Sequence, residues 1–292
     1  MELRRRALEL LLIAEPKVKA RRAREWSDAD AATIAVDVQA SLVEPAGVPG
    51  RPERPRRVPP NELAARSTFT REGRAALLHA VAHIEFNAIN LALDAVWRFA
   101  GMPRDYYVQW MRVASEEALH FTLVAEHLAT LGHAYGDFDA HDGLWTMAER
   151  TRDDPLARMA LVPRTLEARG LDVTPAMREK LVRAGDDAAA RILDVILRDE
   201  IGHVAVGNHW YRWLCARSGR DPIAAYADLA ARFRAPRLKP PFNLAARRAA
   251  GFDAAELAAL QPLEAARDEA ARDSTAPSRP AQAIDPARAA KA

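Results

Sequence analysis

The sequence predicts an all-α protein: an antiparallel four-helix bundle with a long crossover between its second and third helices and helical extensions at both ends. Two observations lead to this prediction. Apolar residues recur at the spacing of helices over most of the chain, between short segments rich in glycine and proline. A lone glutamate followed by a Glu-x-x-His turn also occurs twice, because Glu117 follows Glu85 by 32 residues and Glu200 follows Glu167 by 33.

The bulk composition excludes several classes of protein. The chain has 292 residues, 49% of them apolar, which is ample for a core, and 42 basic residues against 40 acidic ones leave a net charge of +2. Cys215 is the single cysteine, so an internal disulfide and a thiolate zinc cluster are excluded, and we expect a cytoplasmic protein. No apolar run approaches the roughly 18 residues that span a bilayer, so we expect no membrane segment.

The first elements are an N-terminal arm and a helical hairpin. Residues 1–60 form the arm, whose end, 45–60, is so rich in proline and glycine that it predicts an extended connector. A long helix is then expected from Ser67 or Thr68 to Gly101, and a second from Asp105 to Gly132. Their short loop indicates an antiparallel pair. The next residues, 132–142, predict a crossover.

The second hairpin is less regular in sequence. A third helix is expected over 144–169, with Pro155 and Pro163 as irregularities, and a fourth over 187–217. Segment 170–175 (GLDVTP) predicts a break directly after Glu167, because it holds a glycine and a proline. If residues 175–184 continue the third helix beyond this break, both hairpins bring their glutamate and their Glu-x-x-His turn to one level.

The remaining residues are predicted to support the bundle. Segment 222–253 should pack on it as helices, so that the bundle domain spans 61–255. Residues 256–292 are expected to be partly helical, and from about Glu264 the chain becomes rich in Ala, Arg, Asp and Pro, a composition typical of disorder.

The repeated glutamates and histidines predict a metal centre. In a helix each residue turns about 100°, so a Glu and a His three residues apart lie about 60° from each other and can reach one ion. The glutamates interrupt apolar stripes, where an ionised carboxylate needs a partner, and two divalent cations would balance four of them. A lone Glu on two helices and a Glu-x-x-His on the other two is the ligand set of di-iron or di-manganese bundles. The predicted ligands are Glu85, Glu117, His120, Glu167, Glu200 and His203.

Other readings of single residues remain open at this point. One glutamate on an apolar stripe is most often a salt-bridge partner, and only the six residues together favour a metal site. Glu116 also precedes His120, but it points about 100° away from the stripe, which favours Glu117. His79 and His83 are spaced to chelate a metal, yet ordinary polar positions explain them as well.

Several blocks of the sequence resemble a bacterial ferritin-like family that is described only as a domain of unknown function. The resemblance covers most of residues 60–255. It implies a ferritin-like bundle with a di-iron centre at the six residues named above, but no reaction. The ligand order is also similar, more distantly, to that of tRNA hydroxylases of the same superfamily. The matching blocks are HIEFNAINLALDAVWRF (83–99), EEALHF (116–121), YGDFDAHDGLW (135–145), LEARGLDVTP (166–175), RDEIGHV (198–204) and PPFNLAARRAAGF (240–252).

From these patterns we expect an oxygen-activating oxidoreductase with two iron ions, or manganese in their place. Its partners would be dioxygen, a small-molecule substrate and an external electron donor, since the chain has no dinucleotide fingerprint. The break at 170–175 would be either a candidate opening for substrate or a helix-packing adjustment forced by Gly170 and Pro175. Iron storage and tRNA modification are the alternatives, and a homo-oligomer is left open. Acidic residues dilute the arginine clusters at 21–24 and 51–57, which argues against nucleic acid.

Overall fold

The computed structural model describes residues 2–263, and over that range the protein is all-α, with one isolated bridge between Arg57 and Ala140. The predicted disordered tail lies outside the described residues. The elements in order are α1 (Leu3–Leu11), α2 (Pro16–Ala23), α3 (Asp28–Thr33), η1 (Pro60–Glu62), α4 (Arg71–Arg98), α5 (Arg104–Thr130), α6 (Gly143–Arg150), α7 (Pro155–Leu161), the π-helical segment η2 (Val162–Glu167), α8 (Ala168–Arg183), α9 (Asp187–Arg217), α10 (Pro222–Arg232), α11 (Leu244–Ala249) and α12 (Ala254–Ala258).

Helices α4 and α5 form the first hairpin, with bounds close to those predicted. The Thr70 side chain caps α4 by accepting from the backbone N–H of Gly73. The hairpin turns at Gly101, whose φ of 75° lies in the left-handed region that favours glycine. Among the described helices, α4 alone is long and apolar enough to cross a membrane, but 78% of its most apolar window is buried inside the protein. That is the position of a core helix.

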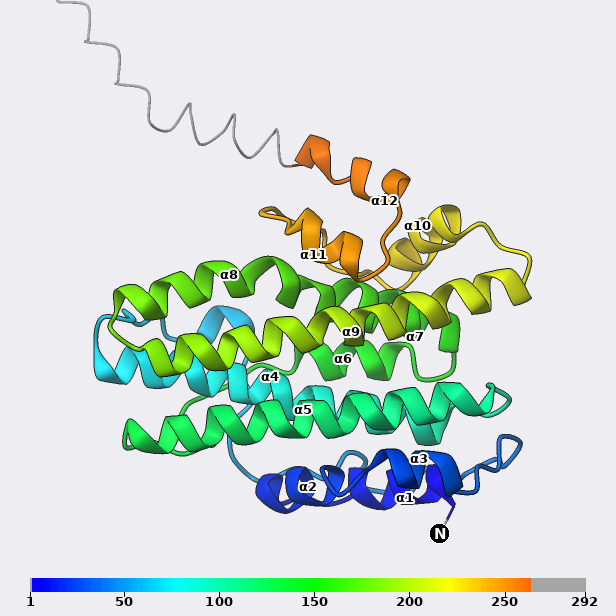
Figure 1. Cartoon of the computed structure of the whole chain (residues 1–292), viewed down its shortest axis with the longest axis horizontal. Coiled ribbons are helices and arrows are strands. Elements are labelled where there is room, and N and C mark those ends of the chain that lie inside the picture. The colour runs from blue at the N-terminus through cyan, green and yellow to red at the C-terminus, as the bar shows by residue number, and fades with distance from the viewer. Residues whose placement is uncertain (1, 264–292) are drawn as a thin grey trace, which may run out of the picture.

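Helices α8 and α9 form the second hairpin, which turns at Gly185 with a φ of 76°. Figure 1 shows α4, α5, α8 and α9 running along the long axis of the molecule. Helix α9 packs against α5 on one side and against α7, η2 and α8 on the other. The second hairpin therefore lies against the first, and the predicted ligand positions face a common interior.

The predicted break at 170–175 is wrong, because α8 runs through it with Pro175 inside the helix. Proline cannot donate to the carbonyl four residues before it. Here Asn243, just before α11, supplies the missing donor, since its Nδ2 donates to the Leu171 oxygen over 3.2 Å. The irregularities lie earlier in the chain. Residues 151–154 separate α6 from α7, and Pro163 falls within η2.

The N-terminal arm is fastened to the first hairpin by two buried cations. Figure 1 shows α1–α3 lying against α5 at one side of the molecule, and α1 also packs on α4. Arg4 donates to the backbone oxygens of Asp37, Ala40 and Trp97. Lys19 donates to two backbone oxygens and to Asn90 Oδ1. Every donor of the buried ammonium therefore has an acceptor, as burial of a charge requires.

The C-terminal segment covers the other side of the molecule, over α8 and α9 (Figure 1). Buried arginines hold this segment against the bundle. Arg247 donates to Asp172 on α8 over 2.7 and 2.9 Å. Arg164 of η2 donates to Asn208 on α9 and to Glu256 on α12, and its guanidinium stacks over the Phe252 ring. These contacts tie α8 and η2, the segment that carries Glu167, to α9 and to the elements that follow it.

Candidate metal centre

The two Glu-x-x-His turns face each other in the interior. Glu117 and His120 come from α5, Glu200 and His203 come from α9, and all four are buried. One potential ligand atom from each lies within 4.8 Å of the others. This cluster could therefore hold a metal ion.

Glu117 lies between the two imidazoles. Its Oε2 is 3.2 Å from His120 Nδ1, and its Oε1 is 2.9 Å from His203 Nδ1. The contact between Glu117 Oε1 and His203 Nδ1 is short enough for a hydrogen bond but does not have the geometry of one. Each oxygen of this carboxylate therefore lies beside a nitrogen that could also be a metal ligand.

The other two predicted ligands join the same cluster from the remaining segments. Glu85 of α4 is buried, with Oε2 lying 3.3 Å from His120 Nδ1. Glu167 ends η2, and the negative charges of Glu200 and Glu117 act on it. Glu85 thus joins the four clustered residues by a contact, and Glu167 lies near enough for their charges to act on it. Their role as ligands is not tested by these contacts and stays a prediction.

Several polar atoms of the cluster are buried without a hydrogen-bond partner: Oε2 of Glu85, Glu167 and Glu200, and Nδ1 of His203. A buried acceptor without a partner costs about 1–3 kcal/mol, and more when it is charged. Four such atoms in one cluster would be a heavy penalty if nothing bound them. Oxygen and nitrogen donors of this kind are those that iron and manganese accept, so the residues fit such ions.

The pKa values of most side chains in the cluster are raised, so these side chains bind protons more tightly than they would in water. Burial raises the pKa of Glu85 to about 8, and burial together with neighbouring carboxylates raises the pKa values of Glu167 and Glu200. Burial alone would lower the pKa of His120, but its contacts with Glu117 and Glu85 raise it to about 11. A divalent cation would therefore displace protons from this site.

Sequence reasoning missed the roles of two residues that complete the arrangement. His120 Nε2 donates to Asp199 Oδ2 over 3.2 Å, and His203 Nε2 donates to Glu116 Oε2 over 2.8 Å. Each acceptor directly precedes the predicted ligand glutamate of the opposite helix. Such a bond fixes the proton on Nε2 and directs Nδ1 toward a metal. A signal was present, because an acidic residue precedes Glu-x-x-His in both copies.

His79 and His83 lie outside the cluster. The backbone N–H of Gly136 donates to His79 Nε2, and His83 Nδ1 is 2.9 Å from the hydroxyl of Tyr135. Burial lowers the pKa of each to about 4. Both are neutral side chains with partners of their own. His83 lies two residues before Glu85, a turn of about 200° around α4, so the two side chains point to nearly opposite sides of the helix.

The comparisons with known proteins place the chain in a family. Residues 12–258 match the family described as "Protein of unknown function (DUF455)". The chain belongs to this family. A Haemophilus influenzae relative described as "Uncharacterized protein" is 51% identical over 220 residues, which cover 73% of this chain and 76% of the relative. No solved structure matches the chain significantly. The description of the DUF455 family states no reaction, so the function has to be argued from the site.

Proposed function

We propose that this protein is a ferritin-like four-helix bundle with two iron ions, and that it is an oxidoreductase that activates dioxygen for use on a small molecule. The observation that carries the proposal is the convergence of two Glu-x-x-His turns, on α5 and α9, with lone glutamates on α4 and η2. That is the ligand set of di-iron and di-manganese carboxylate bundles.

The ligands divide naturally into two groups. Glu85 and His120 would form one group and Glu167 and His203 the other, and Glu117, which contacts both imidazoles, would serve both. Glu200 lies beside His203, with Oε1 3.9 Å from Nδ1, and completes the set. Four carboxylates and two neutral imidazoles balance two divalent cations without further charge.

Iron bound here would supply the electrons that reduce dioxygen, chemistry that the side chains alone cannot perform. The chain's own residues hold the ligand side chains and orient them. Asp199 and Glu116 keep a proton on the outer nitrogen of each imidazole. Apolar neighbours on α5 and α9, among them Val113 and Val204, are buried and exclude water from the ligands.

The surroundings of the bundle favour an oxidoreductase over iron storage. Helices α1–α3 and α10–α12 cover two sides of the bundle (Figure 1), where the subunits of a storage shell would have to pack on each other. A native mass measurement separates the two functions. We expect a monomer or a small oligomer, and a closed shell of many subunits would favour storage.

The connector arginines give little support to tRNA modification. Arg56 donates to Asp139 of the crossover over 2.6 and 3.1 Å. Guanidiniums that are already paired with carboxylates contribute less to phosphate binding than free ones. Absence of tRNA binding at low salt would be the expected result.

Metal analysis with a visible spectrum tests the proposal. Protein purified in air should contain two irons per chain and show the absorption of an oxo-bridged iron pair. The metal-free protein, reloaded with zinc, serves as the colourless control. Zinc alone in the purified protein, with no iron taken up on reconstitution, would contradict oxygen chemistry at this centre.

A further inference from the structure

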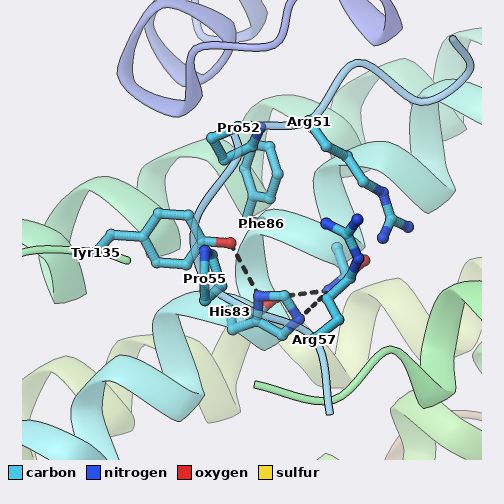
Figure 2. Close-up of a pocket in the computed structure, with 8 residues that line it drawn as sticks. Arg51, Pro52, Pro55, Arg57, His83, Phe86 and Tyr135 are labelled. Carbon is cyan, nitrogen blue, oxygen red and sulfur yellow. Dashed lines mark hydrogen bonds between the residues drawn. The ribbon is translucent and has the colours of Figure 1, made fainter. Parts of the chain in front are cut away.

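A small cleft lies beside α4, on the side away from Glu85. It is formed by two arginines of the connector, Arg51 and Arg57, by His83 and Asn87 of α4, and by Tyr135 of the crossover (Figure 2). Two prolines and a phenylalanine ring complete its wall. The cleft is partly open to solvent, and its space amounts to about 200 Å³ when the open side is included. The space inside it is about 10 Å³, which is room for about one oxygen atom, so the rest of a ligand would lie at the open side.

The hydrogen bonds of His83 assign its protons. Asn87 Nδ2 donates to the backbone oxygen of His83 over 3.0 Å, so this atom is the amide nitrogen. The same nitrogen lies 3.0 Å from His83 Nε2, which must therefore accept. His83 Nδ1 then carries the hydrogen and donates to the Tyr135 oxygen over 2.9 Å, a contact drawn in Figure 2. The hydroxyl hydrogen of Tyr135 is left to donate to another acceptor.

The two guanidiniums add further donors and a surplus of positive charge. Both face Asp142, which pairs with Arg51 Nη1 and lies 3.8 Å from Arg57 Nε. One carboxylate thus faces two cations. Arg51 Nη2 is buried without a hydrogen-bond partner. The Arg57 side chain is 45% exposed and stands at the open side. Asp142 Oδ1 is also buried without a partner. The unpartnered donors, Arg51 Nη2 and the hydroxyl hydrogen of Tyr135, still outnumber this one acceptor, and the two guanidiniums leave one positive charge over.

We propose that this cleft binds an oxyanion group, a carboxylate or a phosphate, between Arg51, Arg57 and the hydroxyl of Tyr135. An oxyanion offers only acceptors and carries the missing negative charge, whereas a water molecule would leave the charge unbalanced. The apolar wall suits a ligand whose anionic group is attached to a short carbon skeleton. The site is separate from the metal centre and does not depend on the function proposed for that centre.

Calorimetric titration of the full-length protein with inorganic phosphate and with acetate tests the proposal, at constant ionic strength set with chloride. We expect saturable binding of at least one anion, and the preferred anion identifies the source of the group. Arg57→Gln should weaken binding about tenfold or more, because it removes a charged donor. Tyr135→Phe keeps the ring and should weaken binding several-fold.

Arg56→Gln is the matched control. Arg56 is adjacent on the same connector, 74% exposed and paired with Asp139, and it does not line the cleft. Its loss should leave the dissociation constant within about twofold of wild type, since a screened surface charge contributes little. The proposal is overturned if neither anion binds saturably, if both arginine variants weaken binding equally, or if phosphate binds Arg57→Gln unchanged, as it would at the metal centre.

Discussion

Replacing Asp199 by Asn should weaken metal binding without unfolding the protein. The carboxylate accepts from His120 Nε2 over 3.2 Å, and its side chain is only 18% exposed, so solvent screens this contact little. Loss of such a partner typically weakens metal affinity by about 10- to 100-fold, which corresponds to about 1.4–2.7 kcal/mol. The amide still accepts a hydrogen bond but carries no charge, so we expect a value near tenfold.

Glu116→Gln should have the smaller effect of the two. Its bond to His203 Nε2 is shorter, at 2.8 Å, but the Glu116 side chain is 42% exposed and water screens its charge. The assay is competition for Mn²⁺ against a chromophoric chelator, with the melting temperature as a check on folding. Asp194→Asn, on the same helix and 47% exposed, removes a charge without contacting either histidine and is the control. Affinity of Asp199→Asn within twofold of wild type would refute the reasoning.

Three further predictions concern ligation, packing and pH. Glu167→Ala should lower metal content in elemental analysis, and stoichiometric iron in this variant would remove Glu167 from the ligand set. Gly207→Ala should lower the free energy of unfolding in urea by about 1–3 kcal/mol, because the added Cβ would lie 2.5 Å from the proline ring of η2. Gly202→Ala is the control and should not lower it, because a Cβ there meets nothing within 4 Å. Burial would raise the pKa of Asp94, but the guanidiniums of Arg158 and Arg98 together outweigh burial and lower it from 3.8. Asp94→Asn should therefore cost about 3–5 kcal/mol at pH 7, and its difference from wild type should shrink as the pH falls below 3.8; an unchanged difference in acid unfolding would contradict this.

The predictions that succeeded depend on local periodicity. Each Glu-x-x-His turn is set by the geometry of one helix, and the apolar stripes around Glu117 and Glu200 indicate which face is buried. Matching intervals then indicate that the two hairpins meet at one level. For this reason the residues of the candidate site could be named before the fold was known.

The failures depend on contacts between distant segments. Gly170 and Pro175 predict a helix end when only their neighbours are considered. The structure keeps the helix because Asn243, about 70 residues later in the chain, donates to the carbonyl that Pro175 leaves free. The helix break that suggested a substrate opening at 170–175 is therefore not found in the structure. The irregular segment is η2, which ends at Glu167.

The pairing of Asp199 with His120 and of Glu116 with His203 was missed for a related reason. Each bond joins α5 to α9, so it depends on how the two helices face each other and not on the spacing within either. Helical geometry correctly predicted that Glu116 points away from the apolar stripe that contains Glu117. It could not show that the outer nitrogen of an imidazole from the opposite helix lies there.

Anaerobic titration of the metal-free protein with Fe²⁺, followed by desalting and elemental analysis, tests the central claim most directly. If both hairpins supply ligands to one centre, the wild-type chain should retain two irons, and His203→Ala should retain no more than one while His209→Ala, on the same helix and exposed, retains both. Retention of a single iron by wild type, or of none, would contradict a two-ion centre.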